Sequence, residues 1–326
     1  LSLKKLLSVD NRLQDPIRNT KIIKASFVTC GAAYFKMLVI TKECDMNNYH
    51  NNNIMHVKNV TLRVGNIEKM LDFYLDVLGM KILDQAANRY SLGTESGRVL
   101  VKFIVDEEAE NATRTTGLFH YALLFPSRHD LGVFLNYLLA IDYPLAGASD
   151  HDVSEAIYLL DPESNGIEIY ADFPENKWKR SKDGIYMTTA AIDHASLLKE
   201  EGEYESIPQE TLMGHLHLRV NNIDQAQAFF IGALGFQKTS DYGPSASFTS
   251  DGGYHHHLAF NTWGGSANPH LGPHQLGLIE YAISVPASRV EKLITRLNEA
   301  GIEYRKEGNN LYLKDINNTS INMVII

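Results

Sequence analysis

A repeated order of one strand, one helix and about three short strands is the feature that most constrains the fold of this 326-residue chain. Residues 57–80 match residues 214–236 without a gap through the helix. Each copy has an alternating strand, an Asn at the helix start, apolar residues at helical spacing, and Gly79 or Gly235 as the helix stop. Self-similarity of this kind predicts a fold made of duplicated units.

A second pair of units follows the same plan. Residues 117–126 match residues 277–286, and a helical pattern follows both copies. The short strands that complete the units are clearest at residues 156–160, 166–170, 255–260 and 310–314. We therefore predict an α+β fold of four βαβββ modules. One such curved sheet leaves a face and an edge uncovered, so the modules are expected to pair into two curved-sheet domains.

The repeats also predict the domain organisation. The expected segments are module 1 at residues 54–112, module 2 at 113–177, a linker at 178–212, module 3 at 213–270 and module 4 at 271–326. Residues 1–53 are expected to be an N-terminal extension that is disordered or not native. Residues 1–45 hold eight Lys or Arg, four acidic residues and both cysteines, so we expect the functional protein to start near Met46.

Charge and cysteine content exclude several classes of partner. The formal net charge is -9, which disfavours nucleic acid and anionic membrane surfaces. Two cysteines cannot form a disulfide framework, and a cytoplasmic location is therefore expected. The most apolar stretch of the extension, residues 25–40, is interrupted by Lys36 and is shorter than the roughly 20 residues of a membrane span. The 13 histidines are the more informative count.

The repeat alignment shows where ligand-type side chains are concentrated. On the first strand the four modules carry, in chain order, Asn59, His120, His215 and Glu280. On the last strand module 2 has Glu168 where module 4 has Asn322. Metal-binding residue types thus gather in modules 2 and 3. Glu280 would be accompanied only by asparagines, which are poor ligands for transition metals, so modules 1 and 4 are expected to form a structural pair.

His120, His215 and Glu168 provide two imidazoles and one carboxylate. This is the set that binds one face of non-haem Fe(II) and leaves positions open for substrate and oxygen. A single carboxylate leaves such a site with about one positive charge, which favours an anionic chelating ligand. The compared strand positions are those that supply metal ligands in the superfamily that this layout resembles, so the resemblance implies a metal site at these three residues.

The four-module layout resembles the vicinal oxygen chelate superfamily, which includes glyoxalases, bleomycin-resistance proteins and extradiol dioxygenases, over residues 54–326. Residues 117–127, 150–172, 186–190 and 252–263 are similar to the catechol 2,3-dioxygenase family. This resemblance implies extradiol cleavage of a catechol, substituted catechol or hydroquinone by O2, with a 2-hydroxymuconate-semialdehyde-type product. It also implies Fe(II), with Mn(II) as the alternative, bound by His120, His215 and Glu168.

The same resemblance implies roles for three further residues. His256, in a His-His-x-x-Ala pattern, is similar to the acid/base histidine that assists dioxygen activation and proton transfer. Tyr158, ten residues before Glu168, and His151 are similar to the residues that orient the bound diol. If residues 255–260 form a regular strand, His255 and His257 point away from His256 and lie behind the site or at the surface.

Two other functions compete with ring cleavage. A glyoxalase or thiol-transferase-like metalloenzyme would need a cationic pocket, and no basic cluster is evident in the sequence. A metal-free binding protein of the bleomycin-resistance type would need an acidic cleft and no metal triad. The expected partners are a small aromatic diol and O2, with a homo-oligomer as an open alternative to a monomer, and the site is expected between modules 2 and 3.

Overall fold

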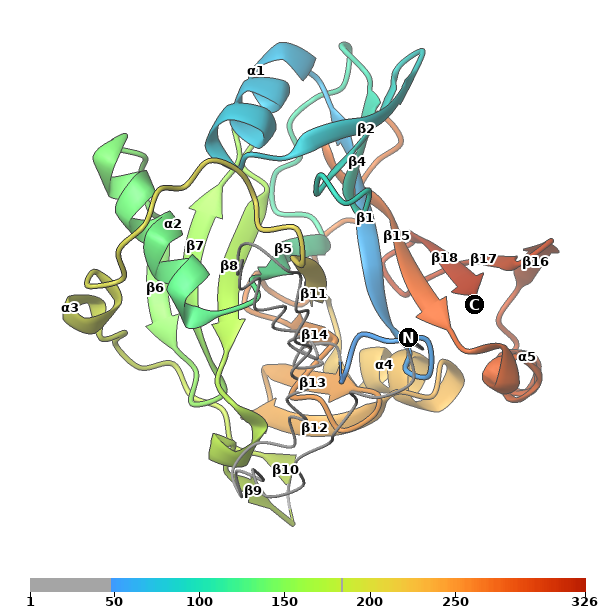
Figure 1. The fold of residues 1–326 in the computed structure, drawn as a ribbon. Helices are drawn as coiled ribbons and strands as arrows, with labels where there is room; N and C mark the ends of the chain where they lie inside the picture. The colour runs from blue at the N-terminus through green and yellow to red at the C-terminus, as the bar shows by residue number, and fades with distance from the viewer. Residues whose placement is uncertain (1–47, 183) are drawn as a thin grey trace, which may run out of the picture. The chain divides into compact units, whose positions relative to one another are not determined.

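Two eight-stranded mixed sheets carry the fold (Figure 1). The 1/4 sheet joins modules 1 and 4, and its spatial order is β16 (Tyr304–Glu307), β17 (Asn310–Lys314), β18 (Ser320–Ile325), β15 (Gly277–Val285), β1 (His56–Val64), β4 (Val99–Val105), β3 (Arg89–Gly93) and β2 (Lys81–Ala86). The 2/3 sheet joins modules 3 and 2, in the order β12 (Gln237–Tyr242), β13 (Ala246–Ser250), β14 (Leu258–Asn261), β11 (Leu212–Arg219), β5 (Gly117–Leu124), β8 (Gly166–Asp172), β7 (Ser154–Leu160) and β6 (Gly147–Asp150). The predicted α+β fold and the pairing of its modules are confirmed.

The computed structural model describes residues 48–182 and 184–326. The predicted extension at residues 1–47 lies outside the described residues, and so does the expected start at Met46. Residues 49–53, which we assigned to the same extension, form turns in which His50 is buried. The Nε2 atom of His50 lies 2.9 Å from the carbonyl oxygen of Gly214, so this segment packs directly against β11.

The seam of each sheet brings the first and last strands of its modules side by side. β5 pairs antiparallel with β11 and parallel with β8, and in the 1/4 sheet β15 pairs the same way with β1 and β18. In the registers of the 2/3 sheet, His217 lies opposite His120 and Glu168 lies opposite Ala122. Residues far apart in sequence are thus neighbours at the centre of the sheet.

The repeated helices begin and end in the same way. Asn66 caps α1 (Ile67–Leu71), which continues into the π-helix η1 (Asp72–Val77), and Asn222 caps α4 (Ile223–Gln227), which continues into the π-helix η3 (Ala228–Ala233). Both asparagines accept a hydrogen bond from the backbone three residues on. Gly79 and Gly235 follow with φ of 66° and 91°, the left-handed conformation in which glycine commonly ends a helix.

The remaining helices are fewer and mostly short. Modules 2 and 4 contribute α2 (Arg128–Ala140) and α5 (Val290–Glu299). Module 2 ends in the 3-10 turn η2 (Glu175–Lys177), and the linker to module 3 holds the small hairpin of β9 (Arg180–Ser181) and β10 (Gly184–Ile185) and then α3 (His194–Leu197). The 3-10 turn η4 (Ala287–Arg289) precedes α5. None of the helices in the described part of the chain is long and apolar enough to cross a bilayer.

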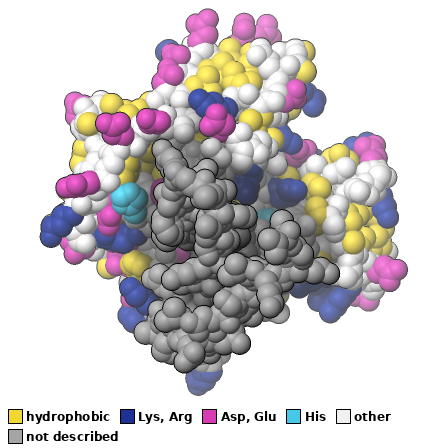
Figure 2. All heavy atoms as spheres, viewed as in Figure 1, with side chains coloured by type: hydrophobic (Ala, Val, Ile, Leu, Met, Phe, Trp, Pro, Cys, Tyr) yellow, Lys and Arg dark blue, Asp and Glu magenta, His cyan; other side chains and the backbone are white. Residues whose placement is uncertain are grey.

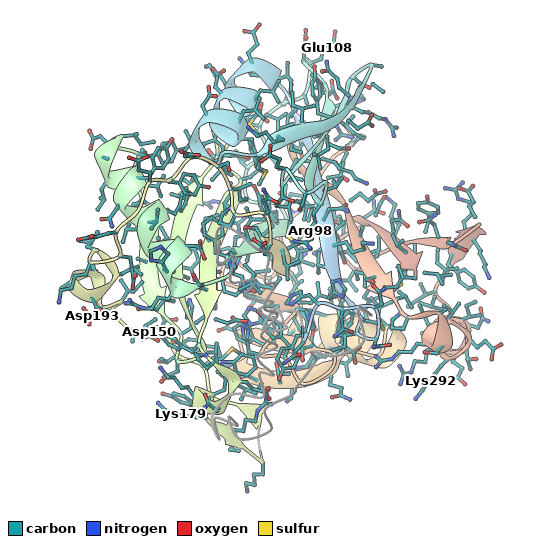
Figure 3. All side chains as sticks on the ribbon, viewed as in Figure 1. Arg98, Glu108, Asp150, Lys179, Asp193 and Lys292 are labelled. Atoms are coloured by element: carbon teal, nitrogen blue, oxygen red, sulfur yellow. The ribbon has the colours of Figure 1, made fainter. Side chains whose placement is uncertain are left out.

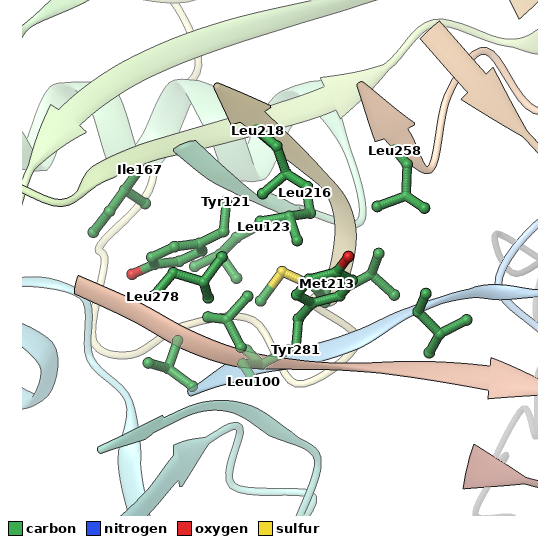
Figure 4. Packing of buried hydrophobic residues seen from close by; sticks show 14 of the residues in the cluster. Leu100, Tyr121, Leu123, Ile167, Met213, Leu216, Leu218, Leu258, Leu278 and Tyr281 are labelled. Atoms are coloured by element: carbon green, nitrogen blue, oxygen red, sulfur yellow. The ribbon is translucent and has the colours of Figure 1, made fainter. Parts of the chain in front are cut away.

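A shared hydrophobic core lies between the two sheets (Figure 4). Tyr121 and Leu123 of β5 and Leu216 and Leu218 of β11 face Leu278 and Tyr281 of β15 across this layer. Because side chains alternate along a strand, His120, His215 and His217 project from the opposite face of the same sheet. Each sheet therefore has one face in the common core and one face free to line a cavity.

Polar contacts join the sheets at the margin of this core. Arg98, labelled in Figure 3, donates from Nη1 to the carbonyl oxygen of Thr211 at 2.9 Å and so ties module 1 to the start of β11. On the surface seen in Figure 2, acidic and basic side chains of the described residues are interspersed.

Candidate metal centre and its cavity

Three buried side chains meet at the centre of the 2/3 sheet. His120 projects from β5, Glu168 from β8 and His215 from β11, and their exposed fractions are 7%, 3% and 1%. One ligand atom from each lies within 4.8 Å of the others, and Glu168 Oε2 is 3.0 Å from His120 Nε2 and 3.3 Å from His215 Nε2. Among the described residues this is the one cluster of three His, Cys, Asp or Glu side chains with such spacing.

The geometry of these atoms fits a divalent metal better than a hydrogen-bonded cluster. The Nε2 atoms of His120 and His215 are buried and have no hydrogen-bond partner, although Glu168 is close to both. An unpartnered buried polar atom is costly, and one cation would satisfy both imidazole nitrogens together with the carboxylate beside them. The donor set, two imidazoles and a carboxylate, is that of facial metal sites with open positions.

Protonation states also suit a metal. Burial opposes ionisation of Glu168, but the neighbouring imidazoles of His215 and His120 hold the pKa of its carboxyl well below its usual range. Burial lowers the pKa of His215 to about 4, with Glu168 acting in the opposite direction. At neutral pH the site thus presents a carboxylate and a neutral imidazole, the forms that bind metals.

A cavity of about 430 Å³ opens above these three residues. Its wall is largely aromatic and imidazole, from Phe119, Tyr158, His217, Phe248 and Trp263, with His151 and His256 also in the lining. Its lining within the described chain contains no lysine or arginine. The size and surface suit a small aromatic molecule.

The hydrogen bonds of Tyr158 and His151 fix where their protons lie. His151 Nδ1 is 2.6 Å from the carbonyl oxygen of Thr188, which can only accept, so Nδ1 carries the proton. His151 Nε2, 2.7 Å from Tyr158 Oη, is then the acceptor and the phenol is the donor. Burial, together with the charge of Glu168, raises the pKa of Tyr158 well above its ordinary value. Tyr158 therefore presents a neutral phenol oxygen that can accept a further hydrogen bond.

A similar argument defines the state of His256. Asp172 Oδ1 lies 2.8 Å from His255 Nε2, so that nitrogen carries a proton and His255 Nδ1 is left as an acceptor. His255 Nδ1 is 2.7 Å from His256 Nδ1, which is then the donor. The Nε2 atom of His256 is consequently unprotonated, and burial keeps the pKa of this residue well below its usual value. The ring of His256 lies 4.0 Å from that of His215, centroid to centroid, so this basic nitrogen belongs to the same cavity.

The structure thus brings together all six residues singled out in the sequence: His120, Tyr158, Glu168, His215 and His256, with His151 joined through Tyr158. Of the two positions expected for His255 and His257, the surface is wrong, and so is the regular strand, whereas His255 does lie behind the site, where it bonds His256. Both are fully buried, and the strand begins only at Leu258 because Gly252 and Gly253, with φ of 69° and 83°, turn the chain before it.

Sequence reasoning missed the role of Asp172, and for Asn261, a candidate to shape the pocket, it did not identify the partner. Asp172 ends β8 and bonds His255, whereas Asn261 ends β14 and bonds His217 Nε2 through its Nδ2 at 2.9 Å. Asp172 falls four residues after Glu168 on the same strand, which placed it near the site but gave no sign of its partner.

The chain belongs to the Glyoxalase/Bleomycin resistance protein/Dioxygenase superfamily, whose family model matches residues 54–169 and 212–313. It is 38% identical over 271 residues, 80% of this chain and 93% of the other, to "Catechol-2,3-dioxygenase" of Bacillus subtilis (strain 168). With such a relative over most of its length, the chain is an enzyme of this superfamily.

Solved structures show the same fold. A presumed dioxygenase from Bacillus subtilis subsp. subtilis str. 168 superposes with a TM-score of 0.57 at 14% identity, covering 84% of this chain and 86% of that one. Glyoxalase I from Zea mays superposes with a TM-score of 0.52 at 13% identity, covering 83% of this chain and 92% of that one.

Proposed function

We propose that this enzyme catalyses extradiol ring cleavage of catechol or a substituted catechol by O2, with Fe(II) bound by His120, Glu168 and His215. The observation that carries the proposal is the convergence of three ligand atoms, two of them imidazole nitrogens without a hydrogen-bond partner, at the base of a cavity that also presents a phenol and a basic imidazole. The relative named Catechol-2,3-dioxygenase supports the same reaction class. The product would be of the 2-hydroxymuconate-semialdehyde type.

The bound metal would supply Lewis acidity toward the two oxygens of a catecholate and the redox chemistry that reaction with dioxygen requires. Two imidazoles and one carboxylate would hold it with a residual positive charge, and this charge would favour an anionic diol. The aromatic lining of the cavity, with Phe119, Phe248 and Trp263, would hold the face of the ring and exclude water.

His256 is assigned as the acid/base residue. Its Nε2 atom is unprotonated in the tautomer fixed by His255 and Asp172, so it can take up a proton in the cavity and return it to the ring-opened product. His256, His255 and Asp172 are joined in a row by two hydrogen bonds. When His256 is protonated at both nitrogens, the Asp172 carboxylate at the other end of this row stabilises the positive charge.

Tyr158 and His151 are assigned to orient the diol. The phenol proton of Tyr158 is committed to His151 Nε2, so a substrate hydroxyl must be the donor to Tyr158 Oη. This preference favours the orientation in which one diol oxygen keeps its proton on the Tyr158 side.

The lining of the cavity favours this function over a thiol-conjugate isomerase. A substrate carrying several carboxylates would need cationic partners, and none line the described wall of this cavity.

The test is metal reconstitution followed by turnover. Anaerobic loading with Fe(II), then addition of catechol in air, should give a yellow ring-opened product that absorbs in the near-visible. Mn(II) loaded in parallel tests the alternative metal, and redox-inert Zn(II) is the control. Absence of product with both Fe(II) and Mn(II), or equal product with Zn(II), would exclude the proposed reaction.

A further inference from the structure

The free face of the 1/4 sheet also lines a cavity, of about 660 Å³. It occupies the place that corresponds to the metal cavity of the 2/3 sheet, because the two seams share one register. Thr61 lies opposite Glu280 here, as His217 lies opposite His120 there. Asn322, opposite Ala282, takes the position of Glu168. The metal ligands are replaced, but the hollow on the sheet is kept.

Charged side chains replace the metal ligands in this cavity. Its lining includes four cations and two acids: Arg63, Arg89, Lys102, Lys314, Asp84 and Glu280. Arg63 donates to the carbonyl oxygens of Gly272 and Gln275, and Lys314 donates to Ser320 Oγ, so these two are already engaged.

The two charged side chains nearest the seam of the 1/4 sheet have no bonding partner among the described residues. Within residues 48–182 and 184–326, neither the half-buried side chain of Lys102 nor that of Glu280 forms an ion pair or hydrogen bond. Both are cross-strand neighbours of Thr61, Glu280 on one side through β15 and Lys102 on the other through β4. With strands about 4.8 Å apart, their backbones are separated by about 10 Å, and the two side chains do not neutralise each other.

Thr61 lies between these charges and is itself unsatisfied. It is 5% exposed, lines the cavity, and its Oγ1 has no hydrogen-bond partner. A buried hydroxyl without a partner is unfavourable unless a ligand completes it. A free cation, a free carboxylate and an unpartnered hydroxyl therefore line one hollow in a row across three adjacent strands.

We propose that this cavity is a second binding site, which takes a small zwitterion carrying a carboxylate and an ammonium group. The carboxylate would lie toward Lys102, with exposed Arg89 at the rim, and the ammonium group toward Glu280, with the Thr61 hydroxyl bonding between them. A ligand with only a negative charge would be repelled by Glu280 and would leave this carboxylate unpaired. A ligand with only a positive charge would be repelled by Lys102 and would leave this ammonium group unpaired. The site is independent of the metal centre and of the reaction proposed for it.

Titration calorimetry of the full-length protein with three matched probes tests the proposal. The zwitterion 4-aminobutyrate should bind at least about tenfold more tightly than butyrate or butylamine, since each of these lacks one charge-assisted partner. Equal affinity for 4-aminobutyrate and butyrate would exclude a role for Glu280, and no measurable binding of 4-aminobutyrate would overturn the site.

Two variants separate the two ends of the ligand. Lys102→Met should reduce affinity for 4-aminobutyrate about tenfold and should not weaken butylamine binding, because it removes a charge that repels this cation. Glu280→Gln should likewise reduce affinity for 4-aminobutyrate about tenfold and should not weaken butyrate binding. Lys292→Met and Glu299→Gln, on α5 and outside the cavity lining, are the matched controls (Lys292 is labelled in Figure 3).

Amide chemical shifts locate the bound probe and report whether each variant is folded. Shifts on 4-aminobutyrate binding should concentrate at Thr61, Lys102 and Glu280. Shifts concentrated at Tyr158 and His217, or wild-type affinity in both cavity variants with intact spectra, would overturn the proposal.

Discussion

At the scale of single residues, the chemistry of the 2/3 cavity depends on which nitrogen and oxygen atoms carry protons. Two groups that can only accept hydrogen bonds determine the histidine tautomers. The Thr188 carbonyl fixes that of His151, and the Asp172 carboxylate fixes those of His255 and His256. The result is a phenol that accepts and an imidazole that is basic on the cavity side. Each side chain therefore has one role that its substitution can test.

Glu168 is predicted to be indispensable for metal binding. Glu168→Gln removes the one negative charge among the three ligands and should weaken Fe(II) binding by more than about 100-fold, since even outer-sphere partners cost up to this much. Metal content after dialysis measures this. Glu155→Gln is the control, because Glu155 is a buried carboxylate of the same sheet that pairs with Arg128. Full iron content in Glu168→Gln would contradict the ligand assignment.

His256 is predicted to act in turnover and not in metal binding. His256→Gln should retain iron and lower kcat by about 10²–10⁴-fold, the usual contribution of a general acid/base. Iron content and kcat of the same preparation are the measurements. His257→Gln is the control, because His257 lies next in sequence but bonds the Tyr49 carbonyl oxygen away from the cavity. Turnover at the wild-type rate in His256→Gln would remove the acid/base role.

Asp172 is predicted to position His256 through His255. Asp172→Asn removes the acceptor-only carboxylate that fixes the tautomer of the pair, and should lower kcat about tenfold. Because the positive charge on protonated His256 is then less stabilised, its pKa falls, and the acidic limb of the kcat pH profile should move to lower pH. Asp152→Asn, whose carboxylate pairs with the exposed Lys179, should change neither. An unaltered pH profile in Asp172→Asn would leave Asp172 with only a structural role.

At the scale of elements, strand β11 carries one ligand and depends on a close approach. An added Cβ at Gly214 would lie 1.9 Å from Tyr170 Oη, whose hydroxyl bonds Tyr254 at 2.7 Å. Gly214→Ala should therefore lower the free energy of unfolding by about 1–3 kcal/mol, as overpacking does, and also weaken metal binding by displacing His215. Urea denaturation measures the first effect.

Gly232→Ala is the matched control for that prediction. Gly232 lies in the π-helix η3 and an added Cβ there meets nothing within 4 Å, so the substitution should be neutral or stabilising by up to about 1 kcal/mol. Equal stabilities for the two variants would contradict the packing argument at β11.

Elements were predictable where a repeat or an alternation specifies them. The strand expected at residues 310–314 coincides with β17, and both repeated helices end at their glycines. The strand expected from His255 begins at Leu258, because backbone turns at Gly252 and Gly253 override the alternating pattern. The contact of Asp172 with His255 and the free charges of Lys102 and Glu280 were not predictable, because they depend on side-chain positions set by tertiary packing.

At the scale of the whole molecule, buried neutral histidines link stability to pH. Burial lowers the pKa of His50 to about 3 and that of His56 to about 4, from an ordinary value of 6.5. Below pH 6.5 the unfolded chain takes up protons that these residues in the folded chain do not. The free energy of unfolding should therefore fall with decreasing pH, by about 1.4 kcal/mol per pH unit for each such histidine.

Comparison with His50→Gln isolates one proton. Urea unfolding of metal-free protein between pH 7.5 and 5 should show a slope against pH that is smaller in the variant by about 1.4 kcal/mol per unit below pH 6.5. Asp161 and Asp315, whose pKa values burial raises to about 6, act in the opposite direction below pH 6, but they are common to both proteins. Identical slopes would show that His50 is protonated in the folded chain.

The proposed reaction is assigned to the cavity of the 2/3 sheet, and this assignment depends on whether that cavity cleaves the ring of a catechol. Turnover of the Fe(II)-loaded enzyme under ¹⁸O₂, with mass analysis of the product, tests this most directly. Extradiol cleavage predicts a ring-opened product with one carboxylate and one aldehyde, and with one labelled oxygen in the carboxylate. An unlabelled carboxylate, a product with two labelled carboxylates, or an intact ring would contradict the assignment.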